Sequence, residues 1–440
     1  MTSPNTTRIE PLARPLDGVA AVPGDKSISH RALMFASMAE GTSRLTGVLN
    51  SADVRSTIAA MSALGATVAL ERQLDGSLAG GITGWGANGP TQPTKPIDCG
   101  NSGTTARLLM GILAPWNIKV EITGDESLKK RPMRRIIAPL MKMGVRFEPE
   151  ACETLPVTIM GTPNLKAITY DSPMASAQLK TAVLLAGLGA TGETVINEPA
   201  ISRNHTELML PEFGVKAGMA FRRASVEGPV TLHANEVDVP GDPSSAAFLI
   251  CAALLKPGSS IQIEKVSLNP GRVGFIRTLE RMGASIEVRY LTAEGKEPIG
   301  IIEAAYTPHL RGCEIPSQHI ASEIDEIPVL ALVAAHASGI TVFRGVSELT
   351  KKESNRLDAI IQGLELMGVN AWAENDNLYI EGQPGLEVPE GLVFDSRKDH
   401  RLAMTWALAG LCSHHAVDII DFDCISVSFP RFLEVMRGLA

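Results

Sequence analysis

The stretch Val22-Pro23-Gly24-Asp25-Lys26-Ser27-Ile28-Ser29-His30-Arg31 places a Gly turn, hydroxyls and fixed cations before an apolar helix that we expect over 32–39. The free amides of a helix N-terminus carry partial positive charge and lack intrahelical partners, so such a place binds anions readily. Lys26 adds a compact point charge, and Arg31 adds a planar fork suited to carboxylate or phosphate. A capped surface helix would show the same residues. Whether the stretch is an anion site therefore depends on whether the pattern recurs along the chain.

The tetrapeptide Val-Pro-Gly-Asp occurs a second time, at 239–242, and both copies lead directly into a helix start that contains serine. We interpret the two copies as the crossings between two domains. One domain then spans about 24–240. The other is discontinuous and combines 1–23 with 241–440.

A second recurring pattern is a helix that ends in a large apolar residue and Gly, followed by a short strand. Gly just beyond a helix end is typical of a left-handed stop, and a spacing of roughly 70 to 85 residues indicates a repeated supersecondary unit. Each repeat also holds an earlier, more apolar helix, so the pattern predicts six repeats, three per domain, with two helices and several strands each. The joints are Leu64-Gly65-Ala66, Met143-Gly144-Val145, Phe213-Gly214-Val215, Met282-Gly283-Ala284, Met367-Gly368-Val369 and a frayed sixth at Met436-Arg437-Gly438, and the apolar helices begin near Ser27, Thr104, Ser176, Ser244, Glu326 and Arg401.

Composition narrows the function classes. Of the 440 residues, 45% are hydrophobic and 20% are charged, as in a globular protein. The formal net charge of −8, without a basic run, argues against nucleic-acid binding. The six cysteines are scattered without metal-ligand spacing, which favours reduced thiols in the cytoplasm. We see neither a signal peptide nor a run of transmembrane length, so we expect no membrane partner. Because metal-ligand spacing is missing, we also expect no metal.

Two apparent nucleotide-binding motifs fail on their context. The segment 84–89 matches GxGxxG, but Pro90 and Pro93 follow where a helix should open. The segment 24–27 lacks the Gly-Lys adjacency and the upstream Gly of a P-loop. We therefore expect neither a dinucleotide nor a nucleoside triphosphate.

Five further segments place charge where apolar periodicity does not require it. In 100–104 a Gly-rich turn opens a helix with Arg107 one turn in, and Arg131-Pro132 starts another helix. The segment 202–205 precedes a helix around Leu208. In 352–356, Glu353 and Arg356 share one face if the segment is helical, and 399–401 opens the last apolar helix. Each alone is more often a cap or a solvated charge, but six such helix starts in one repeat architecture indicate a site for anions.

Together these motifs resemble the 5-enolpyruvylshikimate-3-phosphate synthase family, the 3-phosphoshikimate 1-carboxyvinyltransferases. The match runs from about Pro23 to Phe432, nearly the whole chain. The motifs are PGDKSISHRAL, GNSGTTARLLMGIL, GDESLKKRPMRRI, SAQLKTAVLLAGL, SRNHTE, SEIDEIPVLAL, KKESNRL and DHRLAMTWALAG. The residues Ala177, Arg203 and Val427 resemble the divergent, class II-like branch of the enolpyruvyl transferases.

The resemblance implies an α/β fold of two inside-out α/β barrel domains, each with three βαβαββ repeats, and an active site in the cleft between them. It implies transfer of the enolpyruvyl group of phosphoenolpyruvate to the 5-hydroxyl of shikimate 3-phosphate, through a tetrahedral ketal that expels phosphate, on the shikimate pathway to chorismate and the aromatic amino acids. It further implies a cytoplasmic monomer without cofactor or metal. Both substrates are multiply anionic, which accounts for the cations and helix ends, and the proton transfers require an acid and a base.

Site residues are carried over by motif. Asp325 matches the base that faces the 5-hydroxyl, and Glu353, with Lys26, matches the group that handles the methylene proton. Residues matching ligands of phosphoenolpyruvate are Lys26, Gly103, Arg131, Gln178, Arg356 and Arg401, and those matching ligands of shikimate 3-phosphate are Ser27, Arg31, Ser176, Ala177, Gln178, Arg203, Asp325 and Lys352.

Asp325 has an alternative role. It precedes Glu326-Ile327-Pro328 and is therefore placed to cap a helix through 329–335. Capping lowers the pKa of a carboxylate, and a lower pKa would make Asp325 a weaker base. Crowding by substrate anions in a closed site would raise that pKa again.

One position departs from the family pattern. Many members carry a Lys just before the last Ser/Thr-Phe-Pro element, whereas this chain has Val427 there. One expected cation on phosphoenolpyruvate is thus replaced.

Two other functions compete with this interpretation. The UDP-N-acetylglucosamine enolpyruvyl transferases share the fold but carry a reactive Cys in a loop that ends in Arg-Pro, and here Glu126 stands in its place. A non-catalytic repeat scaffold is the other alternative, but it would not need Lys26, Arg131, Asp325 and Arg401 at helix starts.

Overall fold

The computed structural model describes residues 5–292 and 295–440. These form two compact domains. Domain I comprises Met1–Pro23, Pro240–Glu294 and Pro298–Ala440, and domain II comprises Gly24–Val239 with Gly295–Glu297. The chain changes domain at Pro23/Gly24 and at Val239/Pro240, inside the two Val-Pro-Gly-Asp segments. Each domain has its own aliphatic core.

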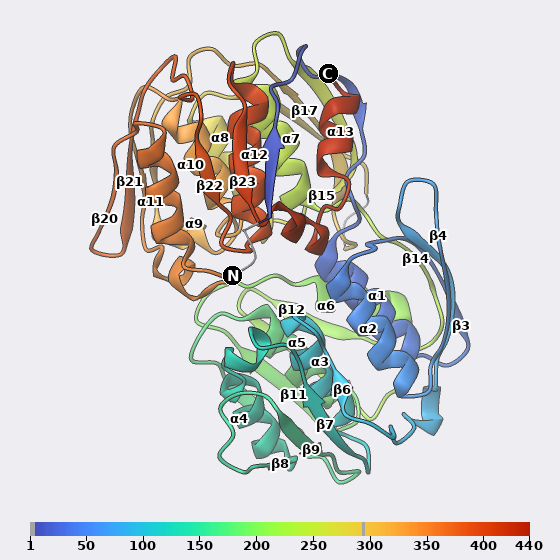
Figure 1. Ribbon diagram of the computed structural model, residues 1–440. Coiled ribbons are helices and arrows are strands. Elements are labelled where there is room, and N and C mark those ends of the chain that lie inside the picture. The colour runs from blue at the N-terminus through green and yellow to red at the C-terminus, as the bar shows by residue number, and fades with distance from the viewer. Residues whose placement is uncertain (1–4, 293–294) are drawn as a thin grey trace. The chain divides into compact units, whose positions relative to one another are not determined.

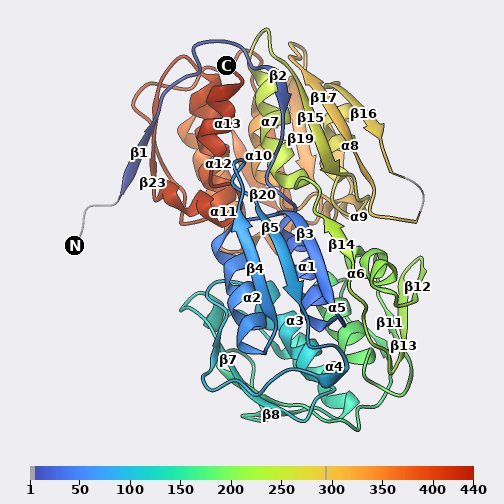
Figure 2. The same cartoon turned by 90° about the vertical axis from the view of Figure 1, so that its right-hand side faces the viewer.

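Domain II contains three four-stranded sheets around three long helices, α1 (Lys26–Met38), α3 (Gly103–Leu113) and α5 (Ala177–Gly187). The strand orders are β14-β3-β5-β4 (Glu236–Asp238, Thr42–Val48, Leu78–Thr83, Thr67–Arg72), β6-β7-β9-β8 (Ile97–Asp98, Lys119–Thr123, Val157–Met160, Arg146–Glu148) and β10-β11-β13-β12 (Thr169–Asp171, Gly192–Asn197, Arg223–Gly228, Ala217–Ala220). The remaining helices are α2 (Ala52–Ala63), α4 (Arg134–Met143), α6 (His205–Met209) and the 3-10 turns η1 (Gly86–Asn88), η2 (Leu128–Lys130) and η3 (Leu210–Phe213). In Figure 2, β3 and β5 lie beside α1, which they contact.

Domain I repeats this plan around α7 (Pro243–Leu255), α10 (Ile327–Ala335) and α12 (His400–Cys412), which lie side by side in Figure 1 and pack on one another. Its strand orders are β16-β17-β15-β2 (Ser285–Tyr290, Ile299–Ala305, Ser260–Ser267, Asp17–Ala20), β18-β19-β21-β20 (Glu314–Ile315, Gly339–Phe343, Asn377–Gly382, Ala371–Glu374) and β1-β23-β22 (Thr6–Ile9, Val417–Ile420, Val393–Asp395). The other helices are α8 (Gly274–Arg281), α9 (Ser317–Ile320), α11 (Arg356–Leu366), α13 (Phe432–Gly438) and the 3-10 turns η4 (Ser347–Lys351) and η5 (Phe422–Val427).

The repeats follow a common pairing rule. The strand before an inner helix pairs in parallel with the strand after it, as in β6/β7, β10/β11, β18/β19 and β22/β23. A β-hairpin then adds antiparallel strands, except in the sixth repeat, where β1 from the N-terminal segment pairs antiparallel with β23. The predicted α/β architecture of six repeats is confirmed. Five joint glycines, such as Gly144 with φ 109°, take the left-handed conformation, whereas Gly438 is the last residue of α13 and ends that helix without this conformation.

The crossings exchange two strands. β2 precedes α1 of domain II but pairs in parallel with β15 of domain I. β14 precedes α7 of domain I but pairs in parallel with β3 of domain II. The rule therefore fails at α1 and α7: the strand after each of these helices pairs in parallel with the crossing strand that precedes the other helix, because each crossing strand stays in the domain that the chain is leaving.

The inner helices are apolar on nearly all sides. All nine residues of α10 are buried, and so are twelve of thirteen in α7, because sheets and neighbouring helices surround them. The predicted starts of these helices agree with the structure to within about one residue of the helix start or its cap. The charged residues of these helices lie in their N-terminal halves, which is where a site can form. In the described ranges the longest helices have 13 residues, too few to cross a bilayer.

Candidate active site

In domain I the N-termini of the three inner helices meet. Asp242 caps α7, since its Oδ1 accepts a hydrogen bond from the Ser244 amide at 2.8 Å. Asp399 caps α12 in the same way through the amide of Arg401, at 3.0 Å. Because these caps are local, the sequence alone sets where each helix begins. The result is a cluster of amide-rich, partly positive helix ends.

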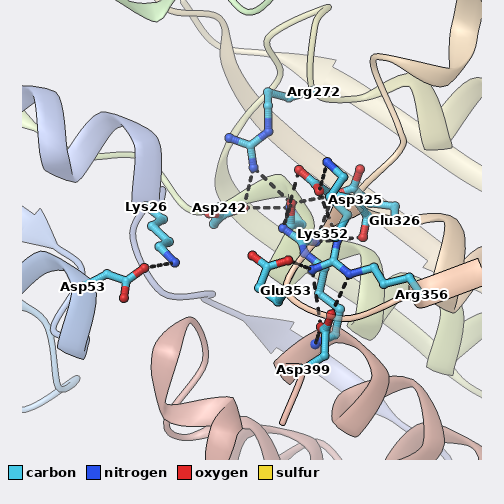
Figure 3. Close-up of polar contacts among 12 residues, drawn as sticks. Lys26, Asp53, Asp242, Arg272, Asp325, Glu326, Lys352, Glu353, Arg356 and Asp399 are labelled. Carbon is cyan, nitrogen blue, oxygen red and sulfur yellow. Dashed lines mark hydrogen bonds and ion pairs between the residues drawn. The ribbon is translucent and has the colours of Figure 1, made fainter. Parts of the chain in front are cut away.

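Arg356 is the centre of this cluster. Its side chain is fully buried, and three carboxylates accept its hydrogen bonds (Figure 3). Nε donates to Asp399 Oδ2 at 2.8 Å, Nη2 to Glu353 Oε2 at 2.6 Å and Nη1 to Asp325 Oδ1 at 3.2 Å. Burial by itself lowers the pKa of Arg356, but Asp399 and then Glu353 outweigh it and hold that pKa above its ordinary value. The guanidinium is therefore a permanent cation.

Asp325 does not cap a helix. The N-cap residue of α10 is Glu326, whose side chain makes no capping hydrogen bond, so the capping alternative for Asp325 was wrong. The Asp325 carboxylate instead accepts hydrogen bonds from Lys352 Nζ and Arg356 Nη1, both at 3.2 Å. Its side chain keeps 15% exposure. Asp325 is thus an accessible carboxylate held between cations.

The segment 352–355 is not helical, so the expectation that Glu353 and Arg356 share a helix face was wrong. Asn355 caps α11 and Arg356 is the first residue of that helix. The two side chains nevertheless pair, because the loop turns Glu353 back onto the guanidinium. Partial burial raises the pKa of Glu353, but Arg356 and then His400 outweigh it and hold this pKa well below its ordinary value.

Arg401 is held by the backbone of Asp325 and by two side chains that the sequence marked as helix starts but not as site residues. Its Nη1 donates to the Asp325 carbonyl oxygen at 2.9 Å and to Glu326 Oε1 at 3.3 Å, and its Nη2 donates to Ser244 Oγ at 3.3 Å. Ser244 Oγ also donates to Glu326 Oε1. The buried Arg272 donates to Ser244 Oγ and to Asp242 Oδ1 at 3.0 and 2.9 Å. Asp242 lies inside the repeated tetrapeptide, whereas Arg272 gave no signal in the sequence.

In domain II the quoted stretch around Lys26 forms the start of α1. Asp25 is buried and caps this helix through the amide of Ile28 at 2.8 Å. Lys26 Nζ pairs with Asp53 Oδ2 at 2.5 Å (Figure 3). Ser27 is half-buried, and its carbonyl oxygen accepts a hydrogen bond from Arg31. Arg31 is almost fully buried, and burial lowers its pKa to about 10.

A second polar cluster of domain II joins α3 to α5. Arg107 Nη1 donates to Gln178 Oε1 at 2.8 Å, and Gln178 Nε2 donates to Thr104 Oγ1 at 3.1 Å. A Cβ at Gly103 would lie 2.8 Å from Nη1 of Arg107 and 3.6 Å from Nη1 of Arg131. Glycine therefore lets both guanidinium groups approach the helix end.

This second cluster is electropositive. Burial, then the neighbouring Arg135 and Arg131, lowers the pKa of Arg107 to about 9. Cations that depress one another's pKa repel one another, and a bound anion would offset this repulsion. Arg107 was placed by the sequence only as a helix residue, and its burial of 94% could not be inferred from periodicity.

The remaining predicted residues lie at the same helix ends. Ser176 caps α5, so Ala177 and Gln178 form its first turn, and Arg203 lies in the loop before α6. Domain II thus holds Lys26, Ser27, Arg31, Gly103, Arg131, Ser176, Ala177, Gln178 and Arg203, and domain I holds Asp325, Lys352, Glu353, Arg356 and Arg401. Val427 is half-buried at the end of η5, and Glu126 is paired with Lys129. Across residues 5–292 and 295–440, the acidic, His and Cys side chains form no group of three that could hold a metal ion.

Comparison with known proteins identifies the family. Residues 12–436 match the family model of EPSP synthase (3-phosphoshikimate 1-carboxyvinyltransferase). The chain belongs to the EPSP synthase family. It is 45% identical over 429 residues to the 3-phosphoshikimate 1-carboxyvinyltransferase of Gluconobacter oxydans, which covers 96% of this chain and 95% of that protein. The corresponding Jannaschia enzyme is 43% identical over 96% of this chain and 94% of the relative.

Solved structures agree with this assignment. EPSP synthase from Acinetobacter baumannii has a TM-score of 0.88 at 38% identity and covers 99% of this chain and 98% of its own. The enolpyruvyl transferase NikO from Streptomyces tendae superposes with a TM-score of 0.78 over the same shares at 18% identity, which establishes the shared fold alone.

Proposed function

We propose that this chain transfers the enolpyruvyl group of phosphoenolpyruvate to the 5-hydroxyl of shikimate 3-phosphate and releases phosphate. Membership of the EPSP synthase family supports this reaction over the sugar-nucleotide and scaffold alternatives. The structural observation that carries it is Asp325, a partly exposed carboxylate that accepts hydrogen bonds from Lys352 and Arg356 beside the N-terminus of α10. Such a group can take a hydroxyl proton while adjacent cations bind the substrate anions.

We assign the steps as follows. Asp325 accepts the proton of the 5-hydroxyl as its oxygen bonds to carbon 2 of phosphoenolpyruvate, and the methylene carbon gains a proton to give the tetrahedral ketal. The methyl group then loses a proton as the bond from carbon 2 to the phosphate oxygen breaks. Lys26 supplies the proton that the methylene carbon gains, and Glu353 accepts the proton that the methyl group loses. The low pKa of Glu353 keeps it ionised before substrates bind but also makes it a weak base, so bound substrate anions must raise this pKa for the elimination step.

Each substrate is bound by residues of both domains. Phosphoenolpyruvate is bound by Lys26, Gly103, Arg131, Gln178, Arg356 and Arg401. Shikimate 3-phosphate is bound by Ser27, Arg31, Ser176, Ala177, Gln178, Arg203, Asp325 and Lys352. This division requires the two domains to close over one active-site cleft and exclude water. We further propose that the protein acts as a monomer in the cytoplasm, which its six unpaired cysteines support.

Phosphate release with shikimate 3-phosphate plus phosphoenolpyruvate tests the reaction. UDP-N-acetylglucosamine as acceptor tests the sugar-nucleotide alternative, and no release with either acceptor would favour the scaffold. The variant Asp325→Ala is expected to bind shikimate 3-phosphate in calorimetry but to lose about 10²–10⁴-fold in kcat, the usual contribution of a general base. Asp75→Ala, in an exposed turn, is the control and is expected to retain turnover. Full turnover of Asp325→Ala would refute the role of the carboxylate.

A further inference from the structure

A buried ion cluster in domain II lies directly behind two loops that carry proposed ligands. Lys180 Nζ pairs with Glu198 Oε2 at 3.0 Å and with Glu207 Oε1 at 2.8 Å. The three side chains are only 5%, 3% and 2% exposed. Removing such charges from water costs several kcal/mol per ion, so a buried cluster is weak evidence for a stabilising role. Its geometry is more informative.

Glu198 uses both carboxylate oxygens to tie the two loops together. Oε1 accepts a hydrogen bond from the Ser176 amide at 2.9 Å, just before α5. Oε2 accepts one from Ser202 Oγ at 2.8 Å, next to Arg203. Glu207, by contrast, pairs with Lys180 through Oε1, and its Oε2 has no hydrogen-bond partner. Both glutamates pair with Lys180, but only Glu198 also accepts hydrogen bonds from the two loops.

We infer that Glu198 is a positioning residue for shikimate 3-phosphate, which acts by fixing the spacing between Ser176 and Arg203. This inference rests on the proposed function. Lys180 pairs with Glu198 Oε2, and both carboxylate oxygens of Glu198 accept hydrogen bonds from the loops. Charge-assisted hydrogen bonds of this kind are about twice as strong as neutral ones, which makes them suitable for fixing loop geometry.

The test compares two isosteric variants that remove one carboxylate each from the same lysine. Glu198→Gln is expected to raise KM for shikimate 3-phosphate about tenfold, the effect of about 1.4 kcal/mol, while kcat and KM for phosphoenolpyruvate change less than about twofold. Glu207→Gln alters the buried charge equally but is expected to leave all three constants within about twofold. Equal increases of KM in both variants would reduce Glu198 to a merely structural role and overturn the inference.

Ser202→Ala removes the second contact and leaves all three charges of the ion cluster in place, so it tests the inference even if Glu198→Gln does not fold. It is expected to raise KM for shikimate 3-phosphate selectively. In a double-mutant cycle its effect should largely disappear in the Glu198→Gln background, because both changes remove the same hydrogen bond. Additive effects, or an unchanged KM in Ser202→Ala, would contradict the inference. Inactivity of the wild type toward shikimate 3-phosphate would instead refute the proposed function.

Discussion

At the scale of single residues, the most constrained group is the Arg356 guanidinium. Asp399 and Arg356 are both completely buried, so the pair cannot be separated without leaving an uncompensated charge. Glu353 belongs to the same cluster but keeps 34% of its side chain exposed. One arginine therefore combines a fixed structural partner with a partner that substrate can reach.

The depressed pKa of Glu353 predicts a pH effect on stability. The folded protein binds the proton of this carboxyl less readily than the unfolded chain, where its pKa is near 4.5. Its stabilising contribution is therefore present above pH about 4.5 and is lost as the pH falls further, toward the lower folded pKa. Glu353→Gln should flatten this part of the stability profile in urea titrations. An unchanged slope below pH 4.5 would show that Arg356 does not depress the pKa.

At the scale of helices, a chain of hydrogen bonds links α1, α2 and α3. His30 Nδ1 lies 2.7 Å from Thr57 Oγ1, which lies 2.6 Å from Thr105 Oγ1. Thr105 donates its hydroxyl proton to Ser102 Oγ, so Thr57 donates to Thr105 and Nδ1 of His30 donates to Thr57. Nε2 is then the unprotonated nitrogen, and it is buried without a partner. Protonation would place a proton where nothing accepts it.

We therefore expect stability to depend on His30 at mildly acidic pH. Burial lowers the pKa of His30 to about 3, against 6.5 for the ordinary side chain, so the unfolded state binds a proton that the folded state excludes. Stability should fall by up to about 1.4 kcal/mol per pH unit as the pH drops from 6.5 toward 3. In chemical denaturation, His30→Gln should lose this slope. A wild-type slope in that variant would mean that His30 titrates freely.

At the scale of the whole molecule, the strand exchange at the crossings gives the two domains different completeness as separate fragments, because only one of them keeps all its strands. Residues 24–239 contain every strand of the domain II sheets, including β14. Residues 240–440 lack β1 and β2, which pair with β23 and β15. The second fragment therefore exposes two strand edges and part of its core.

Fragment 24–239 should consequently unfold cooperatively by circular dichroism, whereas fragment 240–440 should not. Adding residues 5–23 as a separate peptide should restore cooperative unfolding, because β1 and β2 pair with β23 and β15 and the Asp17 amide donates to the Leu439 carbonyl oxygen at 2.7 Å. Cooperative unfolding of 240–440 alone would show that β1 and β2 are dispensable.

Domain closure is the second prediction at this scale. If the two groups of cations act on the same pair of anions, the domains must approach when both substrates are bound. Small-angle scattering should show a smaller radius of gyration with shikimate 3-phosphate and an unreactive phosphoenolpyruvate analogue than with either alone. A constant radius would count against closure.

Much of the fold could be predicted because its signals are local. A Gly beyond a helix, a capping Asp or Ser and an apolar run each act over a few residues, so the six inner helices and the joints could be read directly, apart from Gly438. Local reasoning failed where the backbone left its expected conformation. Capping of α10 by Asp325 was an alternative to its role as the base, and the segment 352–356 was considered as a helix, but long-range partners govern both.

The sequence by itself determined the repeat, the start of each inner helix and the residue types that collect there, because periodicity and capping depend on neighbouring residues. Only the tertiary structure decided that Arg356 is buried among three carboxylates, that Glu326 and Ser244 hold Arg401, and that Glu198 joins two loops. Those contacts link side chains from 3 to more than 150 positions apart, and only packing of the inner helices against one another brings their ends together.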